Sequence, residues 1–322
     1  MKTIEEIFIN EKDFARTMEG KVLPFLNGKI RDGYFKNREG LNLHYQFLVN
    51  PNEKATVVIS HGFCEFTTKY AETVYYFYEM GYSVFLIDHR GHGFSDRQVK
   101  GFYKVHIDDF DDYVEDLHEF VEKIVVPESL TEKLYLFAHS MGGGIGARFL
   151  EMYPKVFSKA VLSSPLMELN TGKTAKWKIK LLGLLSHLPV VEKMYIPGYH
   201  DYDHVYKYPD CSAMSEPRYK YQYDERERVE QYQTSGGTFC WGREAVNVSK
   251  KILKNAHLVK IPVILMQASL DNLVMPQAQV QFSQLAADCR LIVYEDCKHE
   301  IFNASDDIIL KYYTEVLKFF QA

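Results

Sequence analysis

Ser140 stands in the segment Ala138-His139-Ser140-Met141-Gly142, between an apolar stretch and a glycine-rich one. Residues 133–138 have the composition of a buried strand, and residues 141–153 that of a helix ending at Pro154. A serine on a sharp strand-to-helix turn projects its Oγ from the top of a sheet, which is how a nucleophile is held. Ala138 occupies a position where this motif usually has glycine, a difference of one methyl group. We therefore predict that Ser140 is a nucleophile.

A serine hydroxyl needs a base to take its proton and an acid to orient that base. On doubly wound sheets that carry such a serine, the acid and then the histidine follow in chain order, each after a strand. Asp271 follows the apolar segment 262–268, and His299 follows the segment 291–294. The sequence thus predicts a Ser140–Asp271–His299 triad. Glu168, just after the segment 159–164, is the rival for the acid.

A tetrahedral intermediate also needs two N–H donors for its oxyanion. One donor should be the N–H of Met141, the residue after the nucleophile. The other should come from the loop His61-Gly62-Phe63 that follows the apolar segment 55–60, and Phe63 N–H is the candidate because Gly62 allows the backbone to turn. Glu65 is expected to brace this loop.

The elements that must hold these residues alternate between strands and helices. The sequence predicts strands at 41–49, 55–60, 82–87, 133–138, 159–164, 262–268 and 291–294, and helices at 69–80, 108–125, 141–153, 276–287 and 306–320. Buried apolar strands joined by helical crossovers indicate an α/β fold, with a mostly parallel, doubly wound sheet and helices on both faces.

The alternation breaks between residues 166 and 256. This stretch is rich in Tyr, Lys, Asp and Pro, and its one apolar helical piece is 179–188. We predict a mainly helical cap at 166–256, inserted into a core of residues 30–165 and 257–322, with an N-terminal extension at 1–29 that places Phe14, Met18 and Val22 against the core. The cap leucines could contact a membrane or an acyl chain, or could pack the cap on the core; they are Leu181, Leu182, Leu184, Leu185 and Leu188.

Composition excludes several classes of protein. The 322 residues carry a formal net charge of −5, so nucleic acid is not an expected partner. The N-terminus lacks the apolar run of a signal peptide, and no segment is long and apolar enough to span a membrane. The five scattered cysteines favour reduced thiols in the cytoplasm. We expect no cofactor and no metal. The segment Asp88–Gly93 is interpreted as a structural loop, and the segment His200–His204 as a polar surface of the cap.

Several motifs together resemble a known family. These motifs are Ser60-His61-Gly62-Phe63-Cys64-Glu65, Tyr70-Ala71-Glu72, the stretch from Gly81 to Ser95, and His139-Ser140-Met141-Gly142-Gly143. They are similar to those of the bacterial lysophospholipase and monoacylglycerol lipase group of α/β-hydrolases, and the resemblance runs over residues 30–165 and 255–320. The segments 214–219 and 234–244 also resemble the lysophospholipase branch.

The resemblance implies a serine ester hydrolase that releases fatty acid from a lysophospholipid or a monoacylglycerol through an acyl-enzyme. The nucleophile, acid and base of this family correspond to Ser140, Asp271 and His299, and its oxyanion donors correspond to Phe63 and Met141. Glu65, His139 and Trp241 are the candidates for the substrate pocket, and transient contact of the cap with a membrane surface is a further expectation.

Three alternatives stay open. A narrow cap pocket would make the protein a carboxylesterase for short or aromatic acyl esters. An aminopeptidase of the same superfamily would use Glu216 or Glu168 to bind a free amine. A non-catalytic protein on this fold would bind a hydrophobic ligand without reacting.

Overall fold

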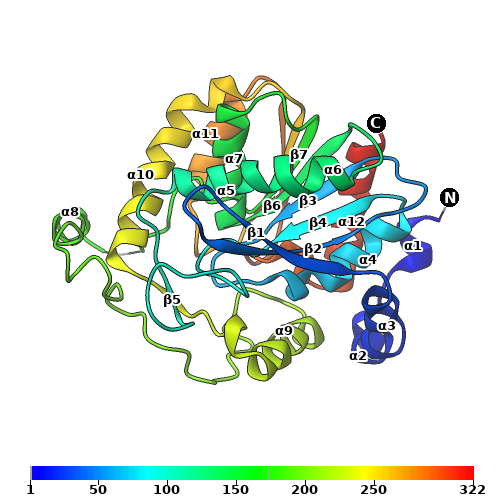
Figure 1. Cartoon of the computed structure of the whole chain (residues 1–322), viewed down its shortest axis with the longest axis horizontal. Helices are drawn as coiled ribbons and strands as arrows, with labels where there is room; N and C mark the ends of the chain where they lie inside the picture. The colour runs from blue at the N-terminus through cyan, green and yellow to red at the C-terminus, as the bar shows by residue number, and fades with distance from the viewer. Residues whose placement is uncertain (1, 173) are drawn as a thin grey trace.

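An eight-stranded sheet forms the centre of the molecule (Figure 1). The computed structural model describes residues 2–172 and 174–322; Met1, in the predicted extension, and Lys173, in the predicted cap, lie outside the described residues. In spatial order the strands are β1 Arg31–Lys36, β2 Asn42–Leu48, β4 Ser83–Ile87, β3 Thr56–Ser60, β6 Leu134–His139, β7 Lys159–Ser163, β9 Val263–Ala268 and β10 Cys289–Tyr294. Only the β1–β2 and β2–β4 pairs are antiparallel, so the prediction of a mostly parallel α/β sheet is confirmed.

Helices cover both faces of the sheet because successive strand residues point to opposite sides. Val58 packs with the helices of one face and Val57 with those of the other. The first face carries α5 Asp111–Phe120, α6 Val126–Glu128, α7 Met141–Met152, α10 Phe239–Asn255 and α11 Pro276–Leu285. The second carries α4 Ala71–Glu79 and α12 Asp306–Gln321. Short 3₁₀ turns lie at Glu11–Asp13, Thr67–Tyr70, Glu230–Tyr232, Ala256–Leu258 and Ile301–Asn303, and π-helical turns at Met18–Val22 and Val121–Val125.

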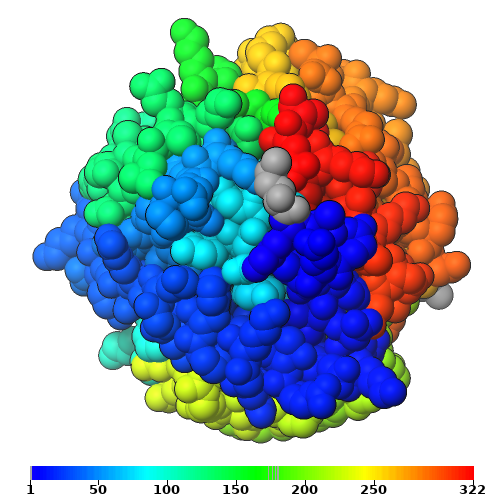
Figure 2. Space-filling model, turned by 90° about the vertical axis from the view of Figure 1, so that its right-hand side faces the viewer, coloured from blue at the N-terminus to red at the C-terminus, as the bar shows by residue number. Residues whose placement is uncertain are grey.

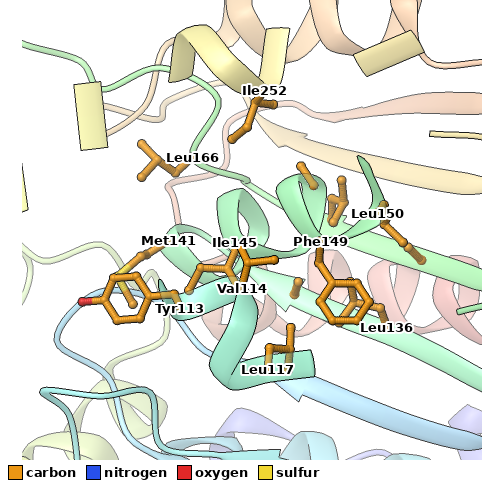
Figure 3. Packing of buried hydrophobic residues seen from close by; sticks show 14 of the residues in the cluster. Tyr113, Val114, Leu117, Leu136, Met141, Ile145, Phe149, Leu150, Leu166 and Ile252 are labelled. Atoms are coloured by element: carbon orange, nitrogen blue, oxygen red, sulfur yellow. The ribbon is translucent and has the colours of Figure 1, made fainter. Parts of the chain in front are cut away.

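The core around α7 is closely packed (Figure 3). Tyr113, Val114 and Leu117 of α5 lie against Ile145 and Phe149 of α7, and all five side chains are buried. This packing fixes α7, and therefore the residue at its start, relative to the sheet.

The N-terminal segment packs beside the C-terminal helix (Figure 2). It comprises α1 Ile4–Ile7, α2 Phe14–Thr17 and α3 Leu23–Asn27, and the π-helical turn joins α2 and α3 without a break. Phe14, Met18 and Val22 are buried, as predicted for the helix that contains them.

The segment 166–256 contributes two helices that stand away from the sheet, α8 Lys176–Leu185 and α9 Glu216–Arg228 (Figure 1). It also supplies β8 Gly236–Gly237, which pairs with β5 Lys104–Val105 in a separate two-stranded sheet. Its last helix, α10, packs against α7 through a buried stripe that includes Trp241, Ala245 and Val248. No helix among the described residues is long and apolar enough to cross a membrane.

Candidate active site

Ser140 occupies the turn between β6 and α7 in a strained backbone conformation. Its φ of 53° and ψ of −118° are rare for a residue with a side chain. The turn is held on both sides, because Ser140 N–H donates to Ser163 O at 3.0 Å and Leu166 N–H donates to Ser140 O at 2.8 Å. The predicted nucleophile therefore stands at the carboxyl end of a central strand.

The glycines after Ser140 let α7 approach its neighbours. A Cβ on Gly142 would lie 2.2 Å from Ser60 O, and one on Gly146 would lie 2.8 Å from the Leu136 side chain. Neither position has room for a methyl group, so the close strand–helix passage predicted from the motif accounts for both glycines. Ala138 fits beside Gly146 with its own methyl group.

Ser140, His299 and Asp271 form one chain of hydrogen bonds. His299 Nε2 lies 2.8 Å from Ser140 Oγ, and His299 Nδ1 lies 2.6 Å from Asp271 Oδ2. Asp271 follows β9 and His299 follows β10, so parallel strand ends bring the three residues together. The histidine and aspartate side chains are each 3% exposed. The catalytic roles predicted for these residues have the geometry they require.

The Asp271 carboxylate is fixed by more than the histidine. Its Oδ1 accepts the N–H groups of Leu273 and Val274 at 2.9 and 3.2 Å. Burial alone would raise the pKa of Asp271, but the hydrogen bonds from His299 and the two N–H groups outweigh it, and the pKa is lowered. Glu168, the rival acid, is exposed, whereas His299 Nδ1 is already bonded to Asp271.

The predicted oxyanion donors lie on the two segments that flank Ser140. Met141 is the first residue of α7, where an N–H has no partner within the helix. Within the described residues, Phe63 N–H donates no hydrogen bond. A Cβ on Gly62 would lie 3.1 Å from Ser140 Cβ, so the Phe63 loop passes directly over the serine. Both N–H groups are available to an oxyanion here, and their role stays a prediction.

Glu65 braces the Phe63 loop. Its Oε2 accepts Gly62 N–H and Tyr70 OH, each at 2.6 Å, and its Oε1 accepts Lys69 Nζ at 2.7 Å. Lys69 also contacts Glu300, the residue after His299, at 2.9 Å. Lys69 and Glu300 were not predicted from the sequence. The only signal was their position, four residues after Glu65 and one residue after His299.

A cavity of about 470 Å³ opens above Ser140 and His299. Its floor includes Glu65 and His139, two of the three residues predicted for the pocket. The third, Trp241, is not among the lining residues in the described part of the chain; its ring packs against that of Phe63 at a tilt of 33°, with ring centroids 4.0 Å apart. The segment after β7 supplies much of the remaining wall, which includes Tyr199, Tyr202, Tyr219, Tyr223 and Arg226.

Arg226 connects the cap segment to the loop above the serine. Its guanidinium donates to Cys64 O at 2.5 Å, next to Phe63. Cys64 itself lines the cavity, but burial raises the pKa of its thiol to about 12, so it is not a competing nucleophile near neutral pH. All five cysteines are free.

The two other candidate clusters are hydrogen-bonded loops. Asp88 accepts from His44, Thr67 N–H and Phe94 N–H, and Arg90 pairs with Asp116, all of them buried or nearly so. This agrees with the interpretation of 88–93 as a structural loop. His200 and His204 are exposed, as predicted for a polar surface of the cap, and His200 and Tyr202 of this segment also line the cavity.

Within the described residues, one set of possible metal ligands converges, namely His106, Asp108 and Cys240. His106 there bonds Thr238 and Asp108, and Cys240 accepts from Arg243, so hydrogen bonds already account for the set.

Known proteins resemble this chain over most of its length. The family model described as serine aminopeptidase, S33 matches residues 51–306. The probable lysophospholipase L2 of Haemophilus influenzae is 27% identical over 302 residues, 93% of this chain and 95% of that protein. The monoacylglycerol lipase of Mycolicibacterium smegmatis is 27% identical over 254 residues, 78% of this chain and 82% of that protein. A soluble variant of the monoglyceride lipase of Saccharomyces cerevisiae, solved with a substrate analogue, has a TM-score of 0.68 at 22% identity and covers 90% of this chain and 94% of that one.

Proposed function

The chain belongs to the α/β-hydrolase family described as serine aminopeptidase, S33, and from that premise we propose that Ser140, His299 and Asp271 are the catalytic triad of an enzyme that hydrolyses single-acyl lipids. Its relatives named lysophospholipase and monoacylglycerol lipase support a lipid ester as the substrate. The observation that carries the proposal is the unbroken hydrogen-bond chain from Ser140 Oγ through His299 to Asp271.

The reaction proceeds in two halves. Ser140 Oγ attacks the ester carbonyl carbon while His299 Nε2 takes the hydroxyl proton, and the oxyanion accepts hydrogen bonds from Phe63 and Met141 N–H. The intermediate collapses, the ester C–O bond breaks, and His299 returns the proton to the leaving alcohol. Water, deprotonated by His299, then attacks the acyl-enzyme, and the fatty acid leaves as Ser140 recovers its proton.

Asp271 keeps His299 ready for both halves. Its Oδ2 accepts the Nδ1 proton, which leaves Nε2 unprotonated toward Ser140. The carboxylate then stabilises the imidazolium that forms in the transition state.

A fluorophosphonate probe tests the nucleophile. The wild type should be labelled and should release fatty acid from a lysophospholipid or a monoacylglycerol. Ser140→Ala should lose labelling, and its kcat should fall by a factor on the order of 10⁴–10⁶. Ser235→Ala is the matched control, because Ser235 lines the same cavity outside the triad.

Other results of this experiment would favour one of the alternative functions. Ser140-dependent labelling with cleavage of short p-nitrophenyl esters alone indicates a carboxylesterase. Absence of labelling would show that the triad is not functional, and would favour a binding protein on this fold.

The description of the matching family also suggests an aminopeptidase. Glu168 and Glu216, nominated to bind a free amine, are not among the described residues that line the cavity. Glu168 is exposed, and the Glu216 carboxylate lies near the Tyr206 hydroxyl. We therefore favour ester hydrolysis, and cleavage of aminoacyl arylamides faster than of lipid esters would reverse that preference.

We also propose that α8 and the chain after it meet the membrane that presents the lipid. Leu184 is 70% exposed and Val190 78%, and Leu181 and Leu188 are exposed beside them. Clustered exposed apolar residues are typical of surfaces that bind membranes or partners. Leu184→Glu with Val190→Glu should reduce sedimentation with phospholipid vesicles and leave hydrolysis of a short dissolved ester unchanged. Equal sedimentation of variant and wild type would contradict this role.

A further inference from the structure

Three charged side chains are buried together beside the proposed active site. Lys69 Nζ lies 2.7 Å from Glu65 Oε1 and 2.9 Å from Glu300 Oε1, and the lysine side chain is 4% exposed. The other carboxylate oxygens are also occupied, since Glu65 Oε2 accepts from Gly62 and Tyr70, and Glu300 Oε2 accepts from Asn303 at 2.7 Å. The ammonium additionally lies 5.5 Å from the centre of the Phe302 ring.

The two carboxylates belong to the two loops that must cooperate in catalysis. Glu65 holds Gly62, directly before the predicted oxyanion donor Phe63. Glu300 directly follows the predicted base His299, on a loop far away in the sequence. Lys69, in the turn before α4, bonds to both carboxylates, so a single side chain joins the oxyanion loop to the histidine loop.

All three groups remain charged near neutral pH. Burial alone would raise the pKa of both glutamates, but the Lys69 ammonium lowers it below the ordinary value in each. Burial opposes the charge of Lys69, and the two carboxylates nevertheless raise the pKa of the lysine. The neighbouring His139, 3.7 Å from Glu65, is neutral, because burial lowers its pKa to about 4.

Such a cluster is not the simplest way to fill a core. Apolar side chains of similar volume often stabilise a fold as well as a buried ion pair or better. An ammonium between two carboxylates ties them to each other, because moving either carboxylate away would leave a buried charge without its partner. A displacement of catalytic groups by about 1 Å can lower a rate by about 100-fold. Holding the two loops in a fixed relative position would therefore protect the rate.

We propose that Lys69 is a positioning residue that fixes the oxyanion loop relative to the histidine loop through Glu65 and Glu300. This inference rests on the proposed function, because it assigns the two loops their catalytic roles. It concerns the alignment of Phe63 N–H with His299 rather than contact with the leaving group.

Three variants test the role, with a dissolved p-nitrophenyl ester as substrate. Lys69→Met should lower kcat by about 100-fold and leave KM nearly unchanged, because alignment matters in the transition state. Lys69→Arg should recover most of the loss, because it keeps the charge. Arg148→Met is the matched control: Arg148 also bridges two carboxylates, Asp111 and Glu151, away from the site. It should lower the Tm while keeping kcat.

A double-mutant cycle decides the matter if Lys69→Met does not fold. Glu65→Gln and Glu300→Gln are nearly isosteric, and each weakens one side of the bridge. If the bridge acts as a unit, the double variant loses less in kcat than the product of the two single losses. Independent, multiplicative losses would overturn the proposal, as would full kcat in a folded Lys69→Met, or a rise in KM alone. Failure of the wild type to show Ser140-dependent hydrolysis would instead contradict the proposed function.

Discussion

Gly62 lies against Ser140 so closely that a Cβ on Gly62 would stand 3.1 Å from Ser140 Cβ. The same Cβ would stand 3.0 Å from Glu65 Oε2, the atom that accepts Gly62 N–H. The loop that carries the predicted oxyanion donor is therefore pinned between the serine and its own brace.

Gly62→Ala should consequently lower activity without unfolding the protein. The methyl group must push the loop away from Ser140 by a few tenths of an ångström, which separates Phe63 N–H from the oxyanion. We expect kcat to fall by about 10–100-fold, less than the loss of an oxyanion donor altogether. Steady-state kinetics on a short ester measures this. Gly20→Ala is the control, because nothing lies within 4 Å of a Cβ there, and an equal kcat for both variants would contradict the role of the loop.

Asp271→Asn should abolish most activity by changing the tautomer of His299. The asparagine Oδ1 can still accept the N–H groups of Leu273 and Val274. Its NH₂ group then faces His299 Nδ1 and donates to it, so the imidazole proton moves to Nε2, which can no longer take the Ser140 proton. A fall in kcat on the order of 10⁴-fold is expected.

Glu168→Gln is the companion variant, because Glu168 was the other candidate acid and is exposed. It should retain the wild-type kcat. A large loss in Glu168→Gln with activity kept in Asp271→Asn would exchange the two assignments.

Three buried histidines should make the fold sensitive to acid. His61 packs against His89 and His92, with ring centroids 4.7 and 5.2 Å apart. Burial is the main cause that lowers the pKa of each, to about 3 for His92. Between the folded-state pKa of His92, about 3, and the ordinary histidine pKa of about 6.5, the unfolded chain binds protons that the folded chain does not. The free energy of unfolding therefore falls as the pH falls through this range.

The free energy of unfolding in urea should therefore decrease between pH 6.5 and pH 4. His92→Gln should show a shallower decrease, whatever its stability at pH 7, because one of these buried titrations is gone. His257→Gln changes an exposed histidine and should keep the wild-type slope. Parallel slopes for wild type and His92→Gln would contradict the argument.

Local sequence patterns predicted seven of the eight strands of the sheet, all but β1, and the triad, because each signal was contained in one segment. Ser140, Asp271 and His299 each follow an apolar strand, and parallel strand ends must meet. The bridge through Lys69 could not be predicted in this way, since its partners are brought together only by the fold.

Two helices of the cap segment were not predicted from the sequence, each for a different reason. In α9, Arg218 is the one buried residue, so no apolar period marks the helix. In α10, by contrast, Trp241, Ala245, Val248 and Ile252 are buried at helical spacing. This signal was present in the sequence but was obscured by the polar residues around it.

The charged helix α9 leads to the last prediction, because its buried arginine attaches it to the core. Arg218 donates to both oxygens of Glu72 at 2.9 Å, to Asp306 at 3.1 Å and to Ile9 O at 2.7 Å, and its side chain is 1% exposed. It thus joins α9 to α4, to α12 and to the N-terminal segment that lies beside α12 (Figure 2). Tyr221 of α9 also packs on Phe14, but Arg218 is the one buried residue of the helix, so we expect the helix to depend on this attachment.

Arg218→Met should leave the Glu72 carboxylate buried without its cation. Breaking a buried pair in this way costs about 3–5 kcal/mol, measurable as a lower free energy of unfolding in urea. Hydrogen exchange should accelerate first in α9, because its attachment is lost while the sheet is untouched. Lys220→Met removes an exposed pair with Asp224 on the same helix and should cost less than about 1 kcal/mol. Equal losses for the two variants, or unchanged exchange in α9, would show that other contacts hold the helix in place.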